Sequence, residues 1–112
     1  MNINYLEIGM EKRPVCFSVS AIEEIQKEFG DLNNMGKGLT KQDLGVIDRV
    51  LTILLNAGER YCKGMGIDCP PPLKCRPADL LDAHEAADIV HEIFKAIQND
   101  SERSVEVVSK NA

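Results

Sequence analysis

The residues of this sequence best suited to chemistry are its four cysteines, because thiolates bind metal ions and exchange disulfides. They are Cys16, Cys62, Cys69 and Cys75. The last three are separated by six and five residues, whereas structural zinc sites nearly always contain one pair about two to four residues apart. No Cys-x-x-Cys pair is present to favour redox exchange. A zinc site that joins His84 to the last three cysteines stays open as an alternative, but we favour buried or unreactive thiols.

Three further side chains have the types and spacing of metal ligands. His84, Asp88 and His91 stand at i, i+4 and i+7, so a helix would place them on one face. Helical zinc motifs use two histidines four residues apart with an adjacent glutamate, and this segment does not match that pattern. We therefore interpret the three residues as part of a solvated polar face, and we expect no bound metal.

A search for enzymatic groups finds no assembled site. Gly30, Gly36 and Gly38 do not form a dinucleotide or phosphate-binding loop, and no nucleophile is paired with a base. The acidic residues near the end of the chain follow the polar side of a helical pattern. We expect a protein that is not an enzyme, with no catalytic, cofactor-binding or metal-binding residue.

Length and charge narrow the function further. A chain of 112 residues is the size of one domain. Its net charge of -5 and scattered basic residues argue against a nucleic-acid partner. No run approaches the ~20 apolar residues of a membrane helix, and the N-terminal residues do not resemble a signal peptide. We expect a cytoplasmic protein that binds neither membrane nor nucleic acid.

The elements that position these residues begin with an alternating pattern. Apolar residues alternate in the first eight residues, a polar turn follows, and alternation resumes at Val15 and Phe17, which predicts a hairpin over about 2–18. Pro14 must then lie at the start or edge of its strand. An isolated hairpin is marginal in water, so this one must pack on the helices that follow.

Three helices are predicted after the hairpin, over about 20–29, 41–63 and 77–99. Ser20 with Glu23 forms a capping-box pattern at the first, Gly30 ends it, and Pro77 fits the first turn of the last. We expect a loop over 31–39, a Pro-rich loop over 64–72 and a mobile tail over 100–112. The predicted fold is α+β and mainly α, a single domain over 1–99.

The central helix carries more apolar residues than one buried face needs. Its apolar residues wrap much of the helix circumference and include Ile47, Val50, Leu51, Ile53, Leu54 and Leu55. The simpler interpretation is core packing, and the functional one is a groove or patch for a partner helix. The sequence leaves both open.

The order of the elements resembles the tail assembly chaperones of long-tailed bacteriophages. The strand Ile3-Asn4-Tyr5-Leu6 and a turn precede the segment from Arg13 to Gly30, a Phe-containing strand leading into a helix of the form Ala-apolar-x-x-apolar-x-x-x-apolar-Gly. A long helix with Leu54-Leu55-Asn56-Ala57-Gly58, a Pro-rich break and an acidic helix follow. The resemblance covers about residues 1–99, and the cysteines and Pro70-Pro71-Pro72 depart from it.

The resemblance implies a phage or prophage protein in the bacterial host cytoplasm. Such a protein would bind the tape measure protein, keep it soluble and recruit tail tube subunits, and it could form a homo-oligomer. We expect the hairpin face and the central helix to contact the partner. Two alternatives remain, a structural head–tail or tail component of a prophage and a small zinc- or thiol-dependent regulatory module.

Overall fold

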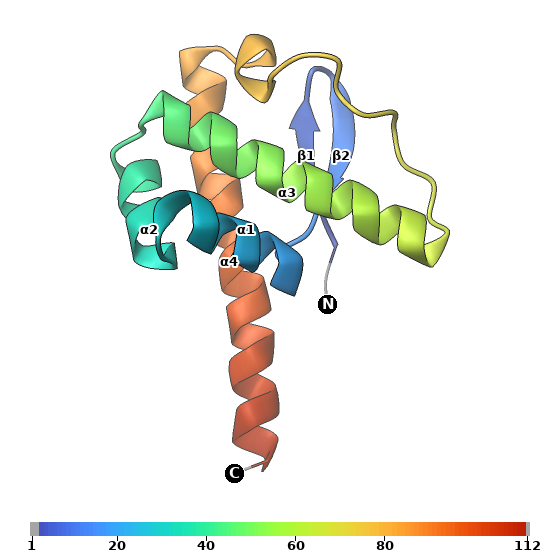
Figure 1. Ribbon diagram of the computed structural model, residues 1–112, viewed down its shortest axis with the longest axis vertical. Coiled ribbons are helices and arrows are strands. Elements are labelled where there is room, and N and C mark those ends of the chain that lie inside the picture. The colour runs from blue at the N-terminus through green and yellow to red at the C-terminus, as the bar shows by residue number, and fades with distance from the viewer. Residues whose placement is uncertain (1–2, 112) are drawn as a thin grey trace.

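The protein folds as a two-stranded sheet packed against helices. The computed structural model describes the backbone of residues 3–111 and the side chains of residues 3–98. The α+β, mainly α prediction is confirmed (Figure 1). The elements are β1 (Asn4–Ile8), β2 (Glu11–Val15), α1 (Val19–Phe29), α2 (Leu32–Thr40), α3 (Leu44–Met65), the 3-10 helix η1 (Pro77–Leu80) and α4 (Ala83–Asn111).

The hairpin closes through a tighter turn than the polar stretch at 9–13 suggested. Strands β1 and β2 are antiparallel, and Ile8 pairs with Glu11. Only Gly9 and Met10 lie between them, with φ angles of +64° and +71°. Positive φ at both central residues defines the type I′ turn, whose twist matches that of paired strands. Met10 is a non-glycine residue in a conformation that favours glycine or asparagine.

Strand β2 passes directly against helix α3. The backbone N–H of Cys16, just after the strand, donates to the carbonyl oxygen of Leu54 at 3.4 Å. A Cβ atom at Gly58 would overlap the backbone carbonyl of Pro14. Glycine is therefore required in the middle of a helix, where it would otherwise be unfavourable.

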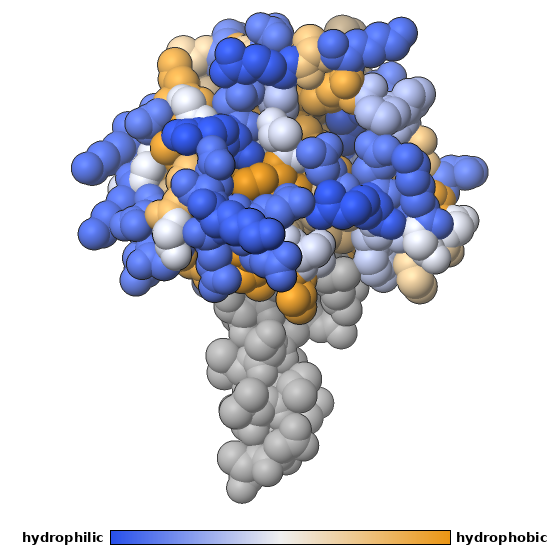
Figure 2. Space-filling model, viewed as in Figure 1, coloured by the Kyte–Doolittle hydropathy of each residue, from blue (hydrophilic) through white to orange (hydrophobic). Residues whose placement is uncertain are grey.

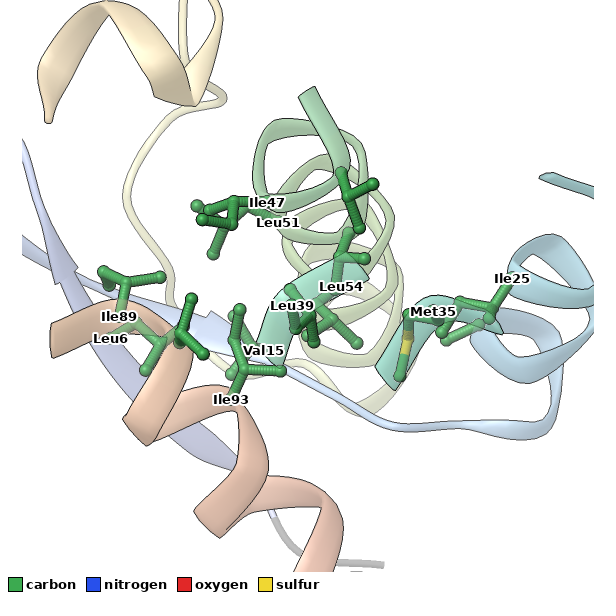
Figure 3. Packing of buried hydrophobic residues seen from close by; sticks show 14 of the residues in the cluster. Leu6, Val15, Ile25, Met35, Leu39, Ile47, Leu51, Leu54, Ile89 and Ile93 are labelled. Carbon is green, nitrogen blue, oxygen red and sulfur yellow. The ribbon is translucent and has the colours of Figure 1, made fainter. Parts of the chain in front are cut away.

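The hydrophobic core lies between the hairpin and the helices on its two sides. Leu6, Ile8 and Val15 of the hairpin are almost fully buried. Figure 3 shows side chains of β1, β2, α3 and α4 converging in one cluster, with α2 and α1 adding to it. The labelled members are Leu6, Val15, Ile25, Met35, Leu39, Ile47, Leu51, Leu54, Ile89 and Ile93. The four helices α1 to α4 thus share one core with the hairpin.

Helix α1 matches its predicted range but has a different cap. Ser18, and not Ser20, is the N-cap, and its Oγ accepts a hydrogen bond from the N–H of Ala21 at 3.2 Å. Gly30 ends the helix in a positive-φ conformation, as predicted.

The loop predicted over 31–39 is wrong, because this segment forms helix α2. Asp31 caps it by accepting from the N–H of Asn34 at 2.7 Å. Met35 and Leu39 are four residues apart and both are buried, so they anchor one face of the helix in the core. Their burial outweighs the cost of two glycines, about 1 kcal/mol each in a helix.

Helix α3 begins three residues later than predicted. Asp43 is its N-cap, with Oδ1 accepting from the N–H groups of Gly45 and Val46 at 3.0 and 3.2 Å. The helix ends at Met65 with Gly66 in the left-handed conformation. The N–H of Ile67 then donates to the carbonyl oxygen of Cys62 at 2.8 Å, which turns the chain back along the molecule.

The single helix predicted over 77–99 is also wrong at both ends. Pro77 does begin a first turn, but of the short helix η1. Asp82 and Glu85 then form a reciprocal capping box that starts α4, with distances of 2.8 and 3.2 Å. The two helices are separate because Leu81, between them, has extended backbone.

Helix α4 continues beyond the predicted end at about residue 99. Residues 99–111 contain neither glycine nor proline, so no stop signal ends the helix before Asn111. In Figure 1 this last part projects away from the body. The mobility of the tail over 100–112 stays a prediction.

Candidate functional site

The apolar surface expected to contact a partner is largely used in the core. The central helix buries Val46, Ile47, Val50, Leu51 and Leu54, so core packing accounts for most of its apolar stripe. The hairpin buries its apolar face in the same cluster. The face of the molecule that carries α3 is mostly hydrophilic in Figure 2. Little of the apolar surface of α3 and the hairpin is therefore available to a partner.

An apolar groove lies between α2 and α4. Its volume is about 560 Å³, and Phe17, from the segment that follows β2, belongs to its lining. Leu32 and Phe94 stand on opposite walls and are each more than one-third exposed. The lining residues of this α2–α4 groove are Phe17, Leu32, Asn33, Met35, Gly36, Lys37, Thr40, Lys41, Phe94 and Ile97.

The charges of the α2–α4 groove differ in sign from those of the whole protein. Lys37 and Lys41 line it, and its lining includes no carboxylate. The chain as a whole carries a net charge of -5. An apolar floor with a basic edge fits an apolar ligand that carries acidic groups at its side.

A second hollow lies beneath the Pro-rich segment, residues 69–76, which we call the strap. The strap has no regular secondary structure and runs from the end of α3 back to η1 (Figure 1). Its carbonyl at Pro71 accepts a hydrogen bond from Nη1 of Arg13 at 2.6 Å. Arg76, at its end, pairs with Asp48 of α3. Proline stiffens the backbone between these two ties.

The strap cleft is the space that the strap encloses with β2 and α3. Its volume is about 390 Å³, within the usual range for small-ligand pockets. Its apolar lining comes from prolines and two leucines, Leu55 and Leu73. The polar lining comes from Arg13, Thr52, Asn56, Glu59, Cys69, Lys74, Cys75 and Arg76. The cleft thus combines an apolar surface with several polar and charged groups, which could fix the orientation of a ligand.

Asp48 is the buried polar side chain that fastens the strap to α3. Its Oδ2 lies 3.1 Å from both Nε and Nη2 of Arg76, and its Oδ1 accepts from the N–H of Ala78 at 2.9 Å. One carboxylate therefore fixes both the end of the strap and the first turn of η1. Buried carboxylates are stable when they are paired and hydrogen-bonded in this way.

The structure brings two of the predicted cysteine ligands together. The thiols of Cys62 and Cys69 share a hydrogen bond, and burial, together with Cys69, raises the pKa of Cys62. Cys69 and Cys75 both line the strap cleft, with Cys75 exposed. Cys16 is buried in the core, apart from this group.

The histidine set is exposed and lies on α4. His84, Asp88 and His91 all face solvent, and Asp88 borders a hollow between α4 and the hairpin. Among the described residues, no three side chains of His, Cys, Asp or Glu gather where a metal ion could bind. Neither the cysteine–histidine set nor the helical histidine set therefore forms a metal site in the described part of the chain.

Sequence reasoning missed the residues that build both hollows. Arg13 belongs to the predicted polar turn, yet its side chain binds the strap 58 residues further along the chain. Asp48 stands among apolar residues of the central helix, and a lone acid at a core position is a signal that could have found it. Asp31, followed by Met35 and Leu39, could have indicated the helix that forms the groove wall.

Comparison with known proteins gives no relative from which a function can be transferred. No family model, no curated protein and no solved structure matches the chain. In the part of the chain that the structure describes, none of the helices has the length and apolar character needed to cross a bilayer.

Proposed function

We propose that this protein binds other proteins and acts as a tail assembly chaperone of a phage or prophage in the bacterial cytoplasm. Its client would be the tape measure protein, a long helical chain, around which it would help to recruit tail tube subunits. The observation that carries the binding role is the α2–α4 groove. The client assignment comes from the order of the elements in the sequence.

The groove supports the binding of an amphipathic helix. Phe17, Met35 and Ile97 offer apolar area, while Leu32 and Phe94 rise at its walls. Helices bind such grooves through apolar residues spaced by three, four and seven positions. Lys37 and Lys41 would pair with acidic residues at the edge of that apolar stripe. The client segment is therefore an acidic amphipathic helix.

The place of the groove suits a long client. Phe94 and Ile97 come directly before the part of α4 that projects from the body (Figure 1). A client helix in the groove could leave it without meeting the rest of the domain. Several copies could then bind along one client chain, each with modest affinity, and together keep it soluble.

Co-expression with the candidate tape measure protein tests this function. The soluble fraction of the client should rise, and Phe94→Asp should abolish the rise because a charge would enter the apolar groove. Tyr5→Asp is the matched control, since Tyr5 is 52% exposed and lies outside the groove. No rise with the unsubstituted protein, or an equal rise with Phe94→Asp, would contradict the proposal.

Two further observations distinguish the chaperone proposal from the alternative functions. Genes for a tube protein and a very long helical protein should flank this gene, and finished virions should lack the protein. A protein retained in virions would instead be a structural tail component. Light scattering should show whether a second copy of the chain occupies the groove. If a dimer forms and Phe94→Asp dissociates it, the groove mediates self-association and does not bind the client.

A further inference from the structure

The strap cleft and the α2–α4 groove have no lining residue in common. The cleft is therefore a separate candidate binding site, and its chemistry depends on Arg13. This side chain is only 14% exposed, although it carries a charge. Arginine is seldom buried to this extent unless its donors are paired.

The guanidinium of Arg13 is paired on one side only. Nη1 donates to the carbonyl oxygen of Pro71 at 2.6 Å. Nη2 lies 3.5 Å from Oε2 of Glu11, a long separation for a charged hydrogen bond. Nε is buried and has no hydrogen-bond partner among the described residues. The edge formed by Nε and Nη2 is thus the unsatisfied side of the group.

That edge has the geometry for a carboxylate. Two parallel N–H donors of a guanidinium match the two oxygens of a carboxylate, and such paired bonds are strong. Leaving a buried N–H without a partner is costly, so a ligand that supplies the acceptor gains affinity. Glu11 is more than half exposed and could yield Nη2 without losing its own hydration.

The remaining lining fits the rest of such a ligand. Leu55 and Leu73, with the prolines of the strap, offer an apolar surface next to Arg13. Lys74 lines the cleft and makes no ion pair within the described residues, whereas the acid of the lining, Glu59, is paired with Lys63 at 2.7 Å. The unpaired charge of the cleft is therefore positive.

We propose that the strap cleft binds a carboxylate attached to an apolar chain, with the Nε–Nη2 edge of Arg13 as its anchor. Two sources share this chemistry: a free carboxylic acid, and the C-terminal carboxylate of a peptide. The strap covers the ligand, and the Arg13–Pro71 hydrogen bond is kept while it binds. The proposal does not depend on the identity of the client protein.

Titration followed by NMR of the arginine side-chain N–H groups tests the proposal. The probes are octanoate, its neutral analogue octanamide, and a short peptide ending in Leu-Leu prepared as the free acid and as the amide. Saturable shifts of the Arg13 Nε–H signal are expected with octanoate or with the peptide acid, and not with the two amides. Whichever acid binds identifies the source, and equal binding of an acid and its amide overturns the proposal.

Two variants locate the anchor. Arg13→Lys keeps the charge but removes the paired donors, so affinity for the bound acid should fall about tenfold or more. Should that variant fail to fold, Asn56→Asp places a negative charge on an exposed residue of the cleft and should weaken binding, whereas Asn33→Asp, in α2, should not. Unchanged affinity in Arg13→Lys or Asn56→Asp overturns the proposal, as does the absence of saturable binding by every probe.

Discussion

Asp48 of α3 holds Arg76 at the end of the strap through two contacts of 3.1 Å to one carboxylate oxygen. Its other oxygen accepts the N–H of Ala78. The carboxylate is buried while the arginine remains largely exposed. Asp48 is therefore the buried member of the ion pair, and the end of the strap is attached to it.

Replacing Asp48 with alanine should destabilise the protein by about 1–3 kcal/mol, because the Ala78 N–H loses its acceptor and the guanidinium its partner. Asp68→Ala is the control, since this exposed residue has no hydrogen bond or ion pair within the described residues, and a change within about 0.5 kcal/mol is expected. Urea unfolding measures both values, and amide exchange should quicken in residues 73–76 and at Ala78, the non-proline positions of this segment. Equal stability of the two variants would contradict the role of Asp48.

Gly58→Ala should lower the free energy of unfolding by about 1–3 kcal/mol, because the new methyl group meets the backbone of β2 and forces the strand from the helix. Gly64→Ala, in the same helix, adds a methyl group to open space. It should raise the stability by up to about 1 kcal/mol, since alanine favours helix more than glycine. Urea unfolding of the two variants checks the difference, and a gain at Gly58 would refute the close approach.

The hairpin turn offers a stabilising change. Met10→Gly should raise the stability by about 0.5–1 kcal/mol, because it relieves a positive φ at a side chain that is 93% exposed. Gly9→Ala should lower it, since the residue has positive φ and a Cβ there would lie 3.0 Å from Leu80. Thermal unfolding followed by circular dichroism measures both, and opposite signs are the expected result.

The four thiols should differ in their reaction with iodoacetamide. Cys75 is exposed and should be labelled first, followed by the partly buried Cys69. Cys16 and Cys62 are buried and should react only on unfolding. Peptide mass spectrometry at successive times gives the order. Early labelling of Cys62 would show that the end of α3 opens in the native state.

The raised pKa of Cys62 predicts a loss of stability in alkali. Burial is the main cause, so the thiol loses its proton in the unfolded chain at lower pH than in the folded one. The free energy of unfolding contributed by this group is present below the unfolded thiol pKa, about 8.5, and is lost as the pH rises above it. Cys62→Ala should flatten this alkaline decline, and Cys75→Ala should not. Identical pH slopes in the two variants would refute the assignment.

Local signals predicted much of the fold. The alternation of apolar residues located the hairpin, and Gly30 marked the end of the first helix. Both depend on interactions between residues that are close in the sequence. Helix α2 was missed because its glycines lower helix propensity, and the burial of Met35 and Leu39 that outweighs them is a tertiary effect.

The two hollows were beyond prediction for a related reason. The strap cleft exists because Arg13 reaches Pro71 and Asp48 reaches Arg76, pairs separated by 58 and 28 positions. The groove needs residues of α2 and α4, far apart in the sequence, to come together with Phe17. The periodicity of a sequence does not reveal contacts between residues this far apart. A charged residue at an apolar position, such as Asp48, does indicate one end of such a contact.

The placement of the hairpin between α3 and α4 also orders events during synthesis. A two-stranded ribbon is marginal alone, and its apolar face contacts residues made much later, such as Leu54 and Ile93. The apolar face of the ribbon therefore stays exposed while more than half of the domain is translated. Completion of the fold is thus set by the translation of α4.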